Sequence, residues 1–87
     1  MLTRTITVNN TVGLHARPAT FFIQKANAFR SSVWVSRDER KVNAKSLLGV
    51  LSLGISKGAE IVLHADGPDE KTALDTLCGL IEKEFVE

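Results

Sequence analysis

Short stretches of this chain alternate between apolar and polar side chains, and the alternation limits the folds open to it. The stretches cover residues 2–8, 33–36 and 60–66. A period of two is typical of a strand that buries one face and leaves the other in water. Strands of a parallel sheet between two helix layers are instead apolar on both faces. The pattern therefore predicts an antiparallel sheet with every helix on the same side.

Between these stretches, apolar residues recur every three or four positions, which is the period of a helix. In the first such segment they are Ala19, Phe22, Ile23, Ala26 and Phe29. Pro18 suits the first turn of a helix, where its missing N–H costs nothing. The first helix is therefore predicted to begin near residue 16.

Two further helices are predicted later in the chain. Ser46 is a favoured N-cap for a short apolar helix over residues 47–53. The turn signal Gly67-Pro68-Asp69 precedes a last helix. Its apolar face is formed by Ala73, Leu74, Leu77, Leu80 and Ile81. With a short third strand at 41–43, the predicted order is β-α-β-β-α-β-α, in a single α+β domain over residues 1–87.

The composition is that of an ordinary soluble domain, with 44% hydrophobic residues, 24% charged residues and a net charge of +1. Disorder is not indicated, and no basic stripe suits nucleic acid. The apolar runs are too short to span a bilayer, and the first residues lack the apolar core of a signal peptide. The single cysteine, Cys78, makes neither an intrachain disulfide nor a zinc site. We expect a cytoplasmic monomer without metal or cofactor.

The segment Gly13-Leu14-His15-Ala16-Arg17-Pro18 places a histidine directly before the predicted first helix. The first N–H groups of a helix lack partners and carry a partial positive charge, so an anion binds well there. Arg17 adds donors suited to phosphate oxygens, and an uncharged histidine ring is a nucleophile near neutral pH. His15 is thus a candidate phosphoryl acceptor, with Arg17 as the phosphate contact. A histidine that only caps the helix explains the same position, and spacing alone does not exclude it.

Ser46 also has two explanations. A serine N-cap is common and needs no further role. A phosphate on Ser46 would be tolerated at the start of a helix, with Lys45 beside it to screen the charge. Position alone favours the plain cap over a regulatory phosphorylation site.

The short helix carries more leucines than one buried face needs. If Val50 and Leu53 face inward, then Leu47, Leu48 and Leu51 are at least partly exposed. An exposed apolar patch of this kind usually marks a protein contact. The alternative, in which all five residues pack in the core, fits the period equally well.

The two segments resemble those of one family, the histidine-containing phosphocarrier protein HPr of the bacterial sugar phosphotransferase system. Residues 13–18 match its phosphohistidine motif, and residues 41–53 match its regulatory serine motif. The resemblance extends over the whole chain in length and order of elements. It implies an open-faced β-sandwich, in which a four-stranded antiparallel sheet is covered on one face by three helices.

The resemblance also implies roles for the candidate residues. His15 would accept a phosphoryl group on its δ1 nitrogen from phosphorylated enzyme I and pass it to sugar-specific enzyme IIA proteins, with Arg17 contacting the phosphate. The protein would then be a phosphocarrier intermediate and not an enzyme in the strict sense. The positions matched to partner contacts are Ala16, Thr20, Leu47, Leu48 and Leu51.

For Ser46, the resemblance implies phosphorylation by HPr kinase/phosphorylase, which uses ATP. The seryl-phosphorylated form would then act with the catabolite control protein CcpA in carbon catabolite repression. Neither nucleic acid nor membrane insertion is expected.

Three residues depart from the family pattern. Position 12 is often a small polar residue in the family and is Val12 here, while Trp34 and Phe21 lie off the predicted core faces and bear on partner choice. Two related types are less consistent with the sequence: the regulatory Crh type lacks the active histidine, and the nitrogen-related paralogue is not expected to share the long match around Ser46. A small RNA-binding domain would need a basic face or an aromatic pair on a strand.

Overall fold

The computed structural model describes residues 1–8, 16–55 and 58–82 of the chain. Its elements are β1 (Leu2–Thr7), α1 (Ala16–Asn27), β2 (Ser32–Arg37), β3 (Arg40–Asn43), α2 (Leu47–Ser52), β4 (Glu60–Asp66) and α3 (Glu70–Glu82). The predicted order β-α-β-β-α-β-α is confirmed. The third strand and the short helix each differ from the sequence prediction by one residue at one end.

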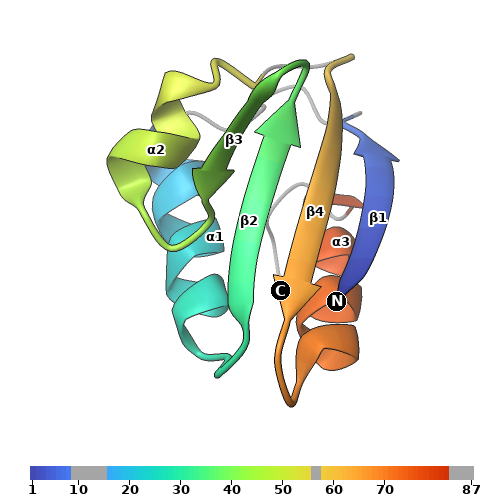
Figure 1. The fold of residues 1–87 in the computed structure, drawn as a ribbon. Coiled ribbons are helices and arrows are strands. Elements are labelled where there is room, and N and C mark those ends of the chain that lie inside the picture. The colour runs from blue at the N-terminus through green and yellow to red at the C-terminus, as the bar shows by residue number, and fades with distance from the viewer. Residues whose placement is uncertain (9–15, 56–57, 83–87) are drawn as a thin grey trace.

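The strands form one antiparallel sheet in the order β1-β4-β2-β3. β4, the last strand in the sequence, therefore lies in the middle of the sheet. Figure 1 shows α1 and α3 behind the sheet and α2 beside β3. The predicted open-faced sandwich is confirmed, because helices cover one face of the sheet and leave the other open.

The covered face of the sheet forms the core. β2 buries Val33 and Val35, and β4 buries Ile61, Leu63 and Ala65 at alternate positions. The buried helix residues that pack with them include Phe22, Val50, Leu74, Leu77 and Ile81. Burying one side chain of this size contributes roughly 1.5–3 kcal/mol. These contacts therefore fix the three helices on the sheet.

The first strand is less buried than its alternation predicts. Leu2 pairs with Ala65 and so lies on the covered face, as expected, yet its side chain is 39% exposed. Ile6 is partly buried. β1 is an edge strand, and edge position is set by the chain's topology and not by the strand's own pattern. Its outer end is therefore open to water.

The open face of the sheet carries polar and aromatic side chains. One row across the four strands consists of Thr3, His64, Trp34 and Asn43. The Ser36 hydroxyl and His64 Nε2 are 3.0 Å apart, and the Lys41 ammonium lies 4.9 Å from the centroid of the Trp34 ring. Partial burial and the charge of Lys41 lower the pKa of His64. The predicted position of Trp34 off the core is confirmed, and His64 lies beside it on the open face.

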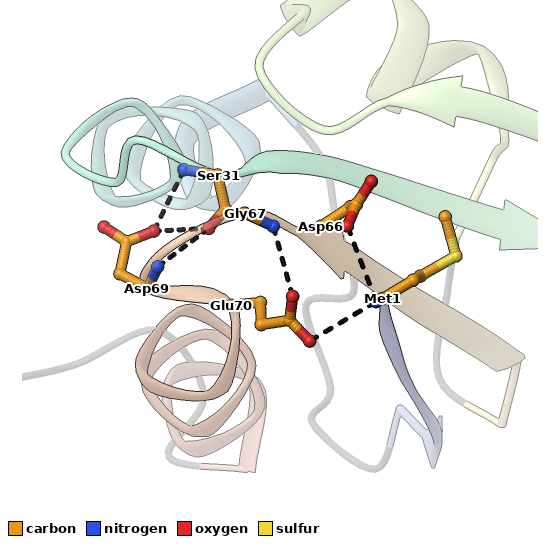
Figure 2. Close-up of polar contacts among 6 residues, drawn as sticks. All are labelled: Met1, Ser31, Asp66, Gly67, Asp69 and Glu70. Carbon is orange, nitrogen blue, oxygen red and sulfur yellow. Dashed lines mark hydrogen bonds and ion pairs between the residues drawn. The ribbon is translucent and has the colours of Figure 1, made fainter.

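Hydrogen bonds join the start of α3 to the start of β2 (Figure 2). The Asp69 carboxylate accepts from the backbone N–H groups of Arg30 (3.0 Å) and Ser31 (2.9 Å) and from the Ser31 hydroxyl. The same hydroxyl accepts from the Asp69 N–H at 3.2 Å. The Ser31 hydroxyl, followed by the backbone donors, lowers the pKa of Asp69 to about 2.

Glu70 and Gly67 complete this junction. Glu70 accepts from the Gly67 N–H at 3.2 Å and pairs with the terminal ammonium of Met1 at 3.5 Å. Gly67 has a φ of +152°, and a Cβ there would lie 2.6 Å from Ser31 Cα. Only glycine permits such an approach. Ser31, Gly67, Asp69 and Glu70 are called the α3 junction below.

Candidate functional site

The first candidate site lies at the start of α1. The helix begins at Ala16, as predicted, so His15 is the residue directly before it. His15 and Val12 lie outside the described residues, as do the side chains of Ala16 and Arg17. Their contacts with phosphate or with partners remain predictions.

The charge pattern at the start of α1 is unusual for a helix. Acidic side chains stabilise the positive end of a helix, yet the first turn of α1 contains none. It contains the cation Arg17 instead. Lys25, in the last turn, is at the end that favours a cation. An anion bound in front of α1 would offset both the helix charge and Arg17.

The rest of α1 is fixed firmly to the core. Ala19, Phe22 and Ala26 are fully buried. Thr20 is exposed, as a partner contact requires. Phe21 is partly buried against the core, so the prediction that it lies off the core face holds only in part. The core contacts give the start of the helix a fixed position relative to the sheet.

Ser46 is the N-cap of α2, as predicted. Its backbone is extended, with φ −109° and ψ 116°, and its hydroxyl oxygen accepts from the Gly49 N–H at 3.2 Å. A Cβ at Gly49 would lie 3.3 Å from both Ser46 Oγ and Val42 Cβ. Glycine at position 49 therefore keeps space around the hydroxyl while α2 packs on β3. Lys45, expected to screen charge at Ser46, donates its ammonium to the Phe29 carbonyl at 2.9 Å.

The large apolar residues of α2 and of its C-cap divide into two sets. Val50 and Leu53 are buried in the core, whereas Leu48 is 81% and Leu47 39% exposed. Leu51 is partly buried. The alternative in which all five residues pack in the core is wrong. We call Leu47, Leu48 and Leu51 the α2 surface.

The two candidate regions lie side by side. α1 packs against α2, and Figure 1 shows α2 beside the N-terminal half of α1. The structure therefore brings together the helix that carries Thr20 and the helix that carries the α2 surface. A single partner can contact both.

Two arginines at the far end of α2 were not identified from the sequence. Arg37 donates to the carbonyls of Leu53 and Gly54, and Arg40 donates to the carbonyl and hydroxyl of Ser52. The only signal in the sequence is that α2 has no basic residue in its own last turn.

Metal and membrane sites are not found in the described part of the chain. No group of three His, Cys, Asp or Glu residues there is placed to hold a metal ion. No helix among the described residues is long and apolar enough to cross a bilayer. Cys78 is buried in α3.

A comparison with known families identifies the chain. The family model described as "PTS HPr component phosphorylation site" matches residues 2–83. The chain belongs to the HPr family. It is therefore related to the phosphocarriers of the phosphotransferase system, and the HPr fold accounts for the arrangement of sheet and helices described above.

Relatives within the HPr family include both a phosphocarrier protein and an HPr-like protein. The HPr-like protein Crh of Bacillus subtilis is 44% identical over 84 residues, covering 97% of this chain and 99% of the relative. The phosphocarrier protein HPr of Neisseria meningitidis serogroup A is 42% identical over 87 residues, covering 100% and 98%.

Solved HPr structures agree closely with this one. HPr of Thermoanaerobacter tengcongensis has a TM-score of 0.95 at 49% identity, over 100% of this chain and 98% of that one. HPr of that organism has also been solved as a dimer, with a TM-score of 0.79. The monomeric state expected for this chain therefore stays a prediction.

Proposed function

We propose that this protein accepts a phosphoryl group on His15 from phosphorylated enzyme I and passes it to sugar-specific enzyme IIA proteins. The observation that carries the proposal is the HPr match over residues 2–83, with a histidine directly before α1. In this role the chain acts as a single cytoplasmic domain, over residues 1–87. It carries the group and does not catalyse a reaction on a separate substrate.

The start of α1 suits the chemistry of a phosphoryl carrier. A ring nitrogen of His15 attacks phosphorus, and the new N–P bond forms as the bond from phosphorus to enzyme I breaks. In a second exchange, the N–P bond breaks as a bond forms between phosphorus and enzyme IIA. Free helix N–H groups and Arg17 stabilise the negative charge of the group when bound and during transfer. With no acidic residue in its first turn, α1 has no carboxylate there to compete for this position.

Incubation with enzyme I and phosphoenolpyruvate tests the proposal directly. Mass spectrometry should show one added phosphate that is lost in acid. His15→Ala should abolish the label. The chain has two histidines, so His64→Ala on the open sheet face is the matched control and should retain it. Persistence of the label in His15→Ala would exclude His15 as the acceptor.

We propose further that Ser46 is a regulatory phosphorylation site for HPr kinase/phosphorylase. Support comes from the position of its hydroxyl at the start of α2, with glycine at position 49 leaving space beside it. Incubation with the kinase and ATP should add one acid-stable phosphate. Ser46→Ala should remove it and Ser52→Ala should not. A protein that gains no acid-stable phosphate under these conditions would contradict the assignment.

A negative charge at Ser46 should slow phosphorylation of His15. The reason is that α1 and α2 lie side by side and would meet enzyme I together. The measurement compares initial rates for the wild type and Ser46→Asp, although aspartate carries less charge than phosphate. Equal rates would show that Ser46 does not act on this contact.

A second candidate function is regulatory, and the 44% identity to Crh favours it. In this role the Ser46-phosphorylated form binds the catabolite control protein CcpA, and no phosphate passes through His15. The transfer assay distinguishes the two functions. An unlabelled wild type that still binds CcpA after Ser46 phosphorylation would be a regulator and not a carrier.

A further inference from the structure

The helix that bears Ser46 and the α2 surface is too short to be stable alone. α2 has six residues with a glycine in the middle. Isolated helices shorter than about 12–15 residues are marginal in water. Its last turn holds no basic residue to meet the negative end of the helix. Groups outside α2 must therefore fix its end.

Arg37 and Arg40 meet that end from the β2–β3 hairpin. They are opposite each other in the strand register, so their side chains lie on the same face. Arg37 Nη1 donates to the carbonyls of Leu53 (3.0 Å) and Gly54 (2.6 Å). Arg40 Nη1 donates to the Ser52 carbonyl at 2.8 Å.

Arg40 makes a second contact through the Ser52 side chain. Its Nη2 donates to the Ser52 hydroxyl at 3.0 Å, and that hydroxyl donates to the Gly49 carbonyl at 2.6 Å. The Arg40 guanidinium thus donates from two nitrogens at once, a fork geometry that the single nitrogen of lysine does not reproduce. Together the two arginines bind three successive carbonyls at this end: that of Ser52, the last residue of α2, and those of Leu53 and Gly54 just after it.

The pair is unusual because like charges opposite each other in a hairpin are destabilising. No carboxylate of the described residues forms an ion pair with either arginine. The compensation comes from the partial negative charge of the carbonyls at and just after the end of α2. The arrangement therefore stabilises one specific thing, which is the position of α2 against the hairpin.

We propose that Arg37 and Arg40 are positioning residues for partner docking, which hold α2 so that Leu47 and Leu48 are presented to enzyme I. This rests on the proposed phosphocarrier function. Leu48 is 81% exposed and so does little to anchor the helix itself. A surface that is already ordered binds more tightly, because less conformational entropy is lost on docking. The arginines act on docking through α2, since their contacts are at its far end.

Steady-state phosphorylation by enzyme I tests the proposal, with the concentration of this protein varied. Arg40→Gln, at an exposed position, and Arg37→Gln should each raise KM about fivefold and leave kcat within about twofold, because docking and not chemistry is weakened. Arg30→Gln is the matched control. It removes the same charge from an exposed side chain that makes no hydrogen bond or ion pair with the described residues of α2, so the KM of this variant should equal that of the wild type.

Conservative variants and hydrogen exchange separate positioning from general stability. Arg37→Lys should have a KM close to that of the wild type, because one ammonium can replace the single Nη1 donor. Arg40→Lys should keep the raised KM of Arg40→Gln. The Gly49 and Val50 amides should exchange faster in Arg40→Gln, while those of α3 stay protected. If the wild type is fully phosphorylated and Arg37→Gln and Arg40→Gln have the same KM as Arg30→Gln, the proposal is overturned. Failure of the wild type itself to be phosphorylated would instead refute the carrier function.

Discussion

The start of α3 differs from the starts of α1 and α2 in how the partial positive charge of the helix is met. At the α3 junction, Asp69 and Glu70 supply carboxylates, and both accept hydrogen bonds within the protein (Figure 2). The first turns of α1 and α2 contain no acidic residue. α3 has thus neutralised its positive end internally, while the other two helices leave theirs without a carboxylate.

The difference separates a structural helix start from a candidate functional one. Carboxylates at α3 stabilise the fold and leave no place for a further anion. The starts of α1 and α2 are where His15 and Ser46 lie in the sequence, the two proposed phosphate acceptors. An added phosphate there supplies a negative charge that the helix lacks.

The largest effect is expected from Gly67→Ala at the α3 junction. The new Cβ would lie 2.6 Å from Ser31 Cα. Overpacking against backbone should lower the free energy of unfolding by about 3 kcal/mol, measured by urea denaturation. Gly79→Ala in α3 is the control, because a Cβ there meets no atom within 4 Å. It should raise stability by about 0.5–1 kcal/mol. Equal effects of the two changes would show that the junction is not tightly packed.

Ser31→Ala should have the next largest effect. Ser31 is buried and its hydroxyl both donates to and accepts from Asp69. Losing both bonds should cost about 2 kcal/mol of unfolding free energy. The neighbouring Ser32→Ala, at an exposed position, should stay within about 0.5 kcal/mol of the wild type. Phosphorylation by enzyme I should be unchanged in both variants at a temperature where both are folded. A slower rate in Ser31→Ala alone would tie the junction to function.

At the start of α2 the expected effects on stability are smaller, and an acidic side chain should be tolerated at position 46. Ser46→Ala removes the cap on Gly49 and should cost about 1 kcal/mol. Ser46→Asp keeps an acceptor and adds a favourable charge, so it should lie about 0.3–1 kcal/mol above Ser46→Ala. Thermal unfolding of the three proteins provides the measurement. If Ser46→Asp were the least stable of them, the start of α2 would not favour an anion.

The smallest effect concerns pH. Hydrogen bonds lower the pKa of Asp69 from 3.8 to about 2 in the folded protein, so the unfolded chain binds its proton first as pH falls. The stabilisation is complete above pH 3.8 and is lost progressively as pH falls toward 2. Asp69→Asn should be less stable at neutral pH and should show a shallower loss across this window. Parallel curves for the two proteins would show that Asp69 does not titrate with folding.

Much of the fold could be predicted because its elements carry their own signals. The alternation in β2 and β4, the helical spacing of α1 and the serine before α2 are local patterns, and local patterns determined these elements correctly. The resemblance in the two motifs then added the open-faced sandwich of four antiparallel strands and three helices, while the strand order came only from the structure. The apolar residues of β4 alternate in only one way, so the pattern predicted which face of this strand is buried.

The remainder depends on contacts between distant segments. The exposure of Leu2 follows from the edge position of β1, and no sequence pattern near Leu2 predicts that position. No local pattern indicates the role of Arg37 and Arg40, since their partners lie 12–17 positions further along the chain. Asp69 was correctly placed at a helix start, but its bonds to Ser31 span 38 positions.

The open face of the sheet has a practical consequence for experiments. Trp34 is the only tryptophan and lies on that face, beneath the Lys41 ammonium. It is on the side of the sheet away from α1 and α3. Its fluorescence emission therefore reports on the integrity of the sheet from a position remote from those two helices. The molecule therefore contains its own optical probe of unfolding.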